Sequence, residues 1–211
     1  IAQLVGPEKH KSFLKKVGVL SSIDFDIEEV APQKDYNFGK CKLATSSFGH
    51  GIATTILQLA RGYAVISNGG YEVKPTLIDK KIENEKKNRL INKDVSNQVV
   101  KALRKIVSTD EGTAKFADVL NYEIGGKTGT TNDSVDAWFA GYQPKIVGVA
   151  WIGFDQPKSL GSRETGGGVA LPIWIGYMQK VLKDIPSEER AVPEGLINTG
   201  SDYYYAENPP G

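Results

Sequence analysis

The sequence predicts an α+β fold in which helices flank an antiparallel sheet. Two strand-like segments, "DAWFAGY" and "KIVGVAWIGF", are rich in aromatic and β-branched residues and are joined at Gln143-Pro144, which indicates a hairpin. Segments with apolar residues at helical spacing precede this hairpin, and another follows it. The order of elements, with helices before three consecutive strands and a helix after them, is typical of an α+β domain.

Length and composition favour one compact domain and exclude several classes of partner. The 211 residues are 40% hydrophobic, which is enough for one sizeable core. The 26 basic and 25 acidic side chains leave a net charge of +1, so the sequence predicts no nucleic-acid partner. No stretch approaches the roughly 18 apolar residues of a membrane span. The single cysteine, Cys41, has no internal disulfide partner and is expected to pack as a small apolar residue.

Two helices and a hairpin are predicted in the first half of the chain. The first helix is expected over residues 7–17, where apolar residues recur at helical spacing opposite a lysine-rich face. The second is expected to be buried and to run from a cap at Thr54 or Thr55 to Asn68. Its apolar positions are Ile52, Ile56, Leu59, Tyr63 and Ile66. Residues 71–92 are predicted to form two short strands around a charged, solvated turn that holds two lysine pairs.

The second half is predicted to contain a helix, three strands and a closing helix. Residues 92–108 carry apolar side chains on one helical face behind a cap at Asn92 or Asp94. These side chains are Val95, Val99, Leu103 and Val107. The segment "YEIGGKTGTT" is predicted to be the first arm of a hairpin with "DAWFAGY", and the closing helix starts near Pro172.

The lysine in "GGKTGTT", Lys127, allows two interpretations. A phosphate-binding loop requires a glycine five residues before Gly126 and a helix after the lysine. The sequence has Asn121 at that position, and a turn and a strand follow the lysine, so this interpretation is rejected. The alternative is an edge strand in which Gly125, Gly126 and Gly129 allow a ligand or another backbone to approach closely.

An edge strand of this composition is suited to bind the end of a peptide. Lys127 and the hydroxyl groups of Thr128 and Thr130 can receive a carboxylate while the peptide pairs with the strand. The backbone N–H of Thr130 is a candidate donor to a developing oxyanion. A plain glycine-bearing edge strand with a surface lysine is the structural alternative.

The block "GGKTGTTNDSVDAWFAGY", followed by "VGVAWIGFDQP" and "LGSRETGGGVALPIW", resembles the C-terminal half of the transpeptidase domain of class A penicillin-binding proteins, in which KTG is the third active-site motif. Upstream, "FGHGIATTILQLARGYAVISNGG" and "PTLI" resemble the helix and strand that precede this motif, and "SFGHGIATT" leans toward the class B type. The resemblance covers residues 40 to 180 and implies the α+β fold of serine β-lactamases and penicillin-binding transpeptidases.

The resemblance implies serine acyl transfer between peptidoglycan stem peptides, with no cofactor, in a protein that also binds β-lactams. Lys127 would supply positive charge to the substrate carboxylate and to the proton network. Thr128 and Thr130 would bind that carboxylate, the Thr130 N–H would form half of the oxyanion hole, and Gly129 would permit close approach. The family also implies a location on the periplasmic side of the inner membrane.

Two further motifs of the family, Ser-x-x-Lys and Ser-x-Asn, do not occur where the family has them. No Ser-x-Asn is present, and the single Ser-x-x-Lys, from Ser12 to Lys15, lies in a region that follows Ser-x-Asn in the family. Met178 is the only methionine, which favours a processed chain or a fragment. We therefore expect the upstream half of the domain, with the nucleophile and a membrane anchor, to be missing. Residues 1–185 are then the C-terminal part of a transpeptidase domain, and residues 186–211 a Pro-rich, loosely structured tail.

Three functions stay open at this point. The first is a D,D-transpeptidase, of which this chain alone is expected to be inactive. The second is a D,D-carboxypeptidase or serine β-lactamase-like hydrolase, which passes the acyl group to water; the aromatic "DAWFAGY" arm and the "ETGGGVALPIW" segment argue against it. The third is a non-catalytic module that binds peptidoglycan peptides.

The remaining candidate side chains receive mainly structural interpretations. The two histidines stand apart from any cysteine or carboxylate cluster at ligand spacing, so no metal site is predicted. His50 is expected to make a local hydrogen bond at a helix start. Asp136 and Trp138 are expected to be structural, whereas Phe139 and Tyr142 are expected to line the groove for the acyl donor.

Overall fold

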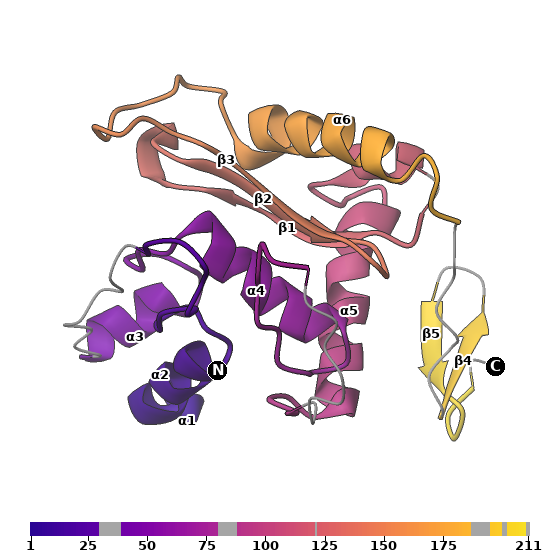
Figure 1. Cartoon of the computed structure of the whole chain (residues 1–211). Coiled ribbons are helices and arrows are strands. Elements are labelled where there is room, and N and C mark those ends of the chain that lie inside the picture. The colour runs from indigo at the N-terminus through magenta and orange to yellow at the C-terminus, as the bar shows by residue number, and fades with distance from the viewer. Residues whose placement is uncertain (30–38, 80–87, 121, 187–194, 200–201, 210–211) are drawn as a thin grey trace.

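The computed structural model describes residues 1–29, 39–79, 88–120, 122–186, 195–199 and 202–209. Its centre is a three-stranded antiparallel sheet with helix α6 on one face and helices α4 and α5 on the other (Figure 1). The strands are β1 (Gly125–Thr130), β2 (Ala137–Tyr142) and β3 (Val147–Ile152). The helices are α1 (Ala2–Val5), α2 (Pro7–Lys16), α3 (Lys40–Ser46), α4 (Ile56–Ser67), α5 (Lys93–Ser108) and α6 (Leu171–Val181). This arrangement confirms the predicted α+β fold.

The order of the strands in the sheet is β1-β2-β3, so β1 and β3 are its edges within the described residues. β1 pairs with β2 from Gly125 opposite Tyr142 to Thr130 opposite Ala137. β2 and β3 form the predicted hairpin, in which Ala137 faces Ile152. The predicted pairing of "YEIGGKTGTT" with "DAWFAGY" is therefore confirmed.

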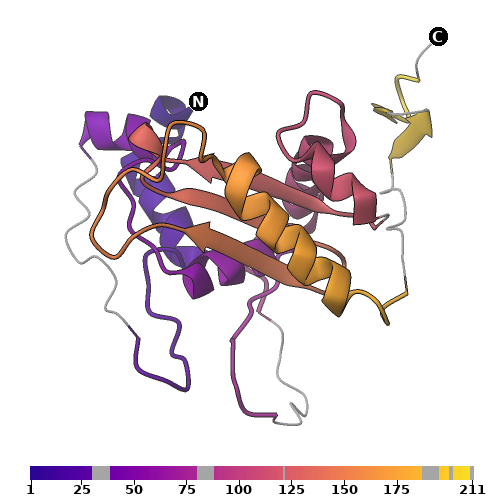
Figure 2. The same cartoon turned by 90° about the horizontal axis from the view of Figure 1, so that it is seen from above.

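The main core lies between the sheet and α6, which crosses the strands on one face (Figure 2). Trp174 of α6 is almost fully buried and meets the Phe139 ring edge-on, with the ring centroids 5.0 Å apart. Its indole N–H donates to the carbonyl oxygen of Gly148 at 3.0 Å, which satisfies the one polar group that this side chain buries. The predicted closing helix is confirmed, with Pro172 in its first turn.

Helix α4 is capped by Thr55, one of the two residues predicted as its cap, and a capping box forms there. Gln58 N–H donates to Thr55 Oγ1 at 3.1 Å, and Thr55 N–H donates to Gln58 Oε1 at 2.9 Å. The predicted apolar face is only partly correct, because Gln58 is buried and Ile56 is 44% exposed. Gln58 tolerates burial since its amide also donates to Ser21 O at 2.9 Å. The capping box thus turns a polar residue inward.

Helix α5 is confirmed with Asn92 as its cap, whose Oδ1 accepts from the N–H of Asp94 at 2.8 Å. Its buried face is only partly the predicted one, since Val107 is buried as expected. Ser96 and Val100 are buried, whereas Val95 is 49% exposed. The hydroxyl of Ser96 donates to the carbonyl oxygen of Ile66 in α4 at 2.5 Å, so this buried polar side chain has a hydrogen-bond partner in the neighbouring helix.

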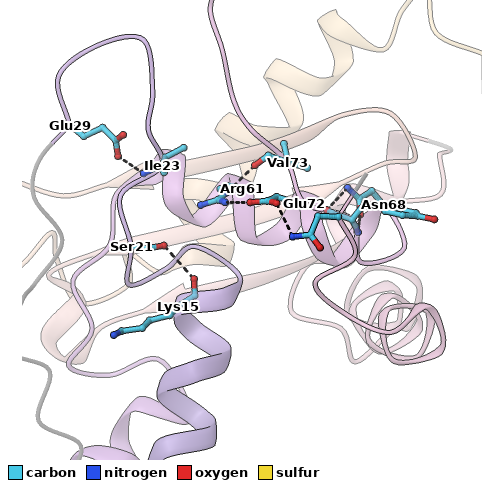
Figure 3. Close-up of polar contacts among 10 residues, drawn as sticks. Lys15, Ser21, Ile23, Glu29, Arg61, Asn68, Glu72 and Val73 are labelled. Carbon is cyan, nitrogen blue, oxygen red and sulfur yellow. Dashed lines mark hydrogen bonds and ion pairs between the residues drawn. The ribbon is translucent and has the colours of Figure 1, made fainter. Parts of the chain in front are cut away.

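The segment that follows α4 is held by side-chain contacts and by a short antiparallel pairing that does not extend into strands. Arg61 of α4 donates from Nε to the carbonyl oxygen of Val73 at 2.9 Å and forms an ion pair with Glu72 at 3.3 Å (Figure 3). In the described part of this segment the two arms meet at one antiparallel bridge, between Tyr71 and Arg89. Backbone hydrogen bonds flank this bridge, from Glu72 N–H to Asn88 O at 2.8 Å and from Leu90 N–H to Gly70 O at 2.7 Å. The prediction of two short strands is wrong here, and the charged tip that was predicted between them lies outside the described residues.

A carboxylate organises the loop that follows the N-terminal helices. Glu29 accepts from the N–H of Ile23 at 2.7 Å (Figure 3). It also accepts from the N–H of Phe25 at 2.8 Å. The hydrogen bond from Ile23, followed by that from Phe25, holds the pKa of Glu29 below its ordinary value of 4.5. Glu29 is therefore a structural carboxylate of this loop and not a base poised near neutral pH.

The predicted surface helix near the N-terminus is confirmed as α2.

The C-terminal segment contains a hairpin that was not predicted. Within residues 186–211, expected to be loosely structured, β4 (Leu196–Thr199) and β5 (Asp202–Tyr205) pair antiparallel. β-branched and aromatic residues favour such strands. None of the described helices combines the length and apolar character needed to cross a membrane.

Gly141→Ala is expected to destabilise the protein by about 1–3 kcal/mol, because overpacking a core displaces side chains from their preferred rotamers. The added Cβ would lie 2.6 Å from the Phe139 ring and 2.8 Å from the Trp174 ring. Gly176→Ala on α6 is the matched control, since nothing lies within 4 Å of its Cβ position. This control is expected to stabilise the helix by about 0.5–1 kcal/mol. Urea unfolding measures both changes, and equal effects would contradict the packing described.

Candidate active site

Lys127 lies on the edge strand β1, and its side chain is exposed. Its ammonium donates to the carbonyl oxygen of Thr128 at 2.9 Å and lies 3.4 Å from Thr128 Oγ1. Among the described residues, no carboxylate lies within 4.0 Å of this ammonium. A lysine in the middle of a strand confirms the strand interpretation and rules out a phosphate loop. It also leaves a cation free to bind an anion at the edge of the sheet.

A second hydroxyl group meets Thr128 from outside the sheet. Thr113, in the loop between α5 and the 3₁₀ helix η1 (Lys115–Leu120), places its Oγ1 at 3.1 Å from Thr128 Oγ1. Both side chains are accessible to solvent in part or in full. Thr113 carries no motif in the sequence, because its partner is 15 residues away and only the fold brings the two together.

A turn of glycines covers the C-terminal end of β1. This π-helical turn, η3 (Gly166–Ala170), leads directly into α6. The N–H of Gly166 donates to Thr130 Oγ1 at 3.0 Å. A Cβ on Gly166 would collide with the carbonyl oxygens of Gly129 and Trp138. The close approach that the sequence predicted at Gly129 is therefore made, in this structure, by another part of the same backbone.

The other two glycines of β1 make room for side chains of β2. A Cβ on Gly126 would lie 2.7 Å from the Phe139 ring, and one on Gly125 would lie 2.6 Å from the Tyr142 ring. These glycines therefore serve the packing of the hairpin, and the free edge of β1 is left to Lys127 and the threonines.

The predicted role of Phe139 and Tyr142 in lining a groove is wrong. Phe139 is 0% exposed and packs against Trp174, whereas Tyr142 is 2% exposed and donates from its hydroxyl to the carbonyl oxygen of Val100 at 3.0 Å. Both rings are buried because α6 covers one face of β2 and α4 packs against the other, with α5 beside it at Tyr142. Aromatic content alone did not distinguish core positions from exposed ones.

Asp136 and Trp138 take part in structural contacts at the start of β2, as expected. Asp136 Oδ1 accepts from the indole N–H of Trp151 at 2.9 Å. The ring of Trp138 lies 5.9 Å from that of Trp151. These contacts fix the open end of the hairpin beside the turn that follows β1.

The two histidines and the cysteine lie away from β1 in sequence and have local contacts. His10 Nε2 lies 3.4 Å from Ser46 Oγ. His50 is in the turn that follows α3, where its backbone N–H donates to Thr45 O at 3.1 Å, and not at the start of α4 as predicted. Cys41 is exposed on the short helix α3, so the prediction that it packs in the interior is wrong. Over the described ranges, no three histidine, cysteine or acidic side chains are grouped as a metal site would require.

Comparison with known proteins points to the same family as the KTG motif does. The family profile of the "Penicillin binding protein transpeptidase domain" matches residues 1–175. Penicillin-binding protein 1A of Neisseria lactamica is 38% identical over 170 residues, which cover 74% of this chain and 21% of that protein. Penicillin-binding protein 1A of Aquifex aeolicus is 40% identical over 151 residues, covering 67% and 20%. The chain thus spans about a fifth of the length of the curated relatives it matches.

Solved structures show the same fold. Penicillin-binding protein 1A from Haemophilus influenzae superposes with a TM-score of 0.74 at 24% identity, over 99% of this chain and 38% of that one. The transpeptidase domain of penicillin-binding protein 3 from Burkholderia pseudomallei superposes with a TM-score of 0.72 at 22% identity, over 90% and 61%. The profile match over most of the chain, together with the fold, shows that the chain belongs to the penicillin-binding protein transpeptidase family, of the class A type.

Proposed function

We propose that this chain forms the β1 side of a serine D,D-transpeptidase site that cross-links peptidoglycan stem peptides and reacts with β-lactams. The observation that carries this proposal is the exposed ammonium of Lys127 on the edge strand, with no carboxylate beside it in the described residues. A strand edge offers main-chain hydrogen bonds to an extended peptide, and a cation next to it suits a peptide that ends in a carboxylate.

The residues of β1 divide the work of binding and catalysis. Lys127 and the hydroxyl of Thr128 bind the terminal carboxylate of the stem peptide. Thr130 Oγ1 already accepts from the N–H of Gly166, so its own proton is free to donate to the same carboxylate. The backbone N–H of Thr130 donates to the oxyanion that develops on the scissile carbonyl, while the turn at Gly166 packs closely against Gly129.

The proposed reaction is two successive acyl transfers. A serine oxygen attacks the carbonyl carbon of the D-alanyl-D-alanine bond, the carbon–nitrogen bond breaks, and D-alanine leaves with the proton from the serine. An amine of a second stem peptide then attacks the acyl ester, the ester carbon–oxygen bond breaks, and a proton from the amine passes to the serine oxygen. Use of an amine, and not water, as acceptor distinguishes this function from a carboxypeptidase or a β-lactamase.

We infer that the nucleophile and its base lie outside these 211 residues. The sequence has no Ser-x-Asn, and its single Ser-x-x-Lys begins at Ser12. Ser12 is on α2, which packs against α1 and α3, while Lys127 is on the edge strand of the sheet (Figure 1). On this proposal the upstream part of the same domain supplies the serine, its lysine and the Ser-x-Asn loop. A membrane anchor upstream would hold the site on the periplasmic side of the inner membrane.

Lys127→Ala in the complete transpeptidase is expected to slow acylation by penicillin at least about tenfold, a rise in the barrier of about 1.4 kcal/mol. The variant removes the charge that faces the substrate carboxylate and the reacting centre. Stopped-flow acylation kinetics measure the effect. Lys180→Ala, which removes an exposed cation from α6, is the control and is expected to react like the parent protein. A folded Lys127→Ala protein with the parent rate would refute the role of this lysine.

The 211-residue chain alone is expected to form no covalent adduct with penicillin, because Ser12 is an exposed residue of α2 and the candidate oxyanion donor, the N–H of Thr130, lies on β1. Incubation with a fluorescent penicillin followed by a denaturing gel tests this directly. The complete transpeptidase is the positive control and is expected to be labelled. A labelled band from the chain alone that disappears in Ser12→Ala would make Ser12 the nucleophile and overturn the proposed division of the site.

A further inference from the structure

We propose that Thr113 is a positioning residue, which turns the hydroxyl proton of Thr128 toward the substrate carboxylate. This inference rests on the function proposed above and adds a residue that belongs to none of the three family motifs. It follows from the number of hydrogen bonds that one hydroxyl group can make and from the two partners that Thr128 already has.

The hydroxyl oxygen of Thr128 has one proton to donate and two lone pairs that can accept. The Lys127 ammonium, 3.4 Å away, can only donate, so it uses one lone pair. Thr113 Oγ1, at 3.1 Å, can either donate or accept. When Thr113 donates, it uses the second lone pair, and the proton of Thr128 is directed away from both neighbours. A carboxylate can only accept, so this is the arrangement that binding requires.

Without the hydroxyl of Thr113, nothing among the described contacts of Thr128 selects that rotamer of its proton. The proton would then be shared between water and the substrate, and the strand would be less well organised for an anion. The exposed position of Thr113 lets it accept from water while it donates to Thr128, so its own hydrogen-bonding capacity is used.

The backbone around Thr113 is fixed, as a positioning residue requires. The next residue, Ala114, is fully buried, and its N–H donates to the carbonyl oxygen of Ile106 at 3.1 Å. On the preceding side, a Cβ on Gly112 would collide with the same carbonyl group. The glycine turn η3 closes the third side, because the Cβ position of Gly167 lies 3.1 Å from the carbonyl oxygen of Thr113. These contacts hold the hydroxyl group at the free edge of β1.

Lys115, the first residue of η1, is a cation that is already paired with acidic side chains. The ammonium of Lys115 donates to Asp118 at 3.1 Å and lies 3.6 Å from Asp110. The hydrogen bond that Lys115 donates to Asp118, together with the charge of that carboxylate, raises the pKa of Lys115. Lys115 is therefore occupied by its own acidic neighbours, and the loop acts on the substrate through the hydroxyl of Thr113.

The test compares a carboxylate ligand with its uncharged ester in the complete transpeptidase. Thr113→Val keeps the shape of the side chain and removes the hydroxyl. It is expected to raise the dissociation constant of the non-covalent penicillin complex about tenfold, because a hydrogen bond to a charged group loses its orientation. The dissociation constant of penicillin methyl ester is expected to change less than about twofold. Thr113→Ser is expected to restore tight binding of the acid, since it restores the hydroxyl.

Thr109→Val is the matched control, because the Thr109 hydroxyl donates to the carbonyl oxygen of Lys105 at 2.7 Å and so takes no part in the contact with Thr128. This variant is expected to leave the dissociation constants of both ligands unchanged. An equal loss for acid and ester in Thr113→Val, or no loss for either, would overturn the positioning role while leaving the proposed function intact. A wild-type complete transpeptidase that does not react with penicillin would overturn the proposed function, and this inference with it. Thermal melting of each variant shows whether the fold is retained.

Discussion

The close approach of the turn at Gly166 to the backbone of β1 and β2 is the constraint on which the candidate active site depends. Without a side chain at this position, the turn can rest on the carbonyl groups of Gly129 and Trp138 and donate to Thr130 at 3.0 Å. The same turn opens α6, whose Trp174 is locked against Phe139 in the main core. The end of β1 is thus positioned by the packing of α6, so the core supports the strand that is proposed to bind substrate.

A rigid strand end matters because the site has to bind charge at a solvent-exposed edge, where ion pairs are weak. Lys127 does not depend on charge alone. Its ammonium is held along the strand by Thr128, and the hydroxyl groups of Thr128 and Thr113 are held in contact by the loop after α5. A carboxylate that arrives at this edge meets donors that are already oriented, so little ordering remains to oppose binding.

Local sequence patterns predicted most of the fold. The sequence predicted the hairpin around Gln143-Pro144 and the strand of Lys127, and it narrowed each helix cap to two residues, of which the structure uses Thr55 and Asn92. Each of these features depends on residues that are near neighbours in the chain. The buried faces were less predictable. Gln58 and Ser96 are buried because hydrogen bonds to distant carbonyl groups satisfy them, and Phe139 and Tyr142 are buried because helices cover both faces of β2. The role of Thr113 could not be predicted from the sequence for the same reason, since its contact with Thr128 exists only in the folded protein.

The central claim is that the edge of β1 at Lys127 and Thr128 binds the carboxylate of the substrate. A crystal structure of the complete transpeptidase after reaction with penicillin tests this claim most directly. The account predicts the ligand carboxylate at hydrogen-bonding distance, about 2.7–3.2 Å, from Thr128 Oγ1, with the ester carbonyl oxygen facing the N–H of Thr130. A covalently bound penicillin whose carboxylate lies away from β1, on other residues, would contradict it.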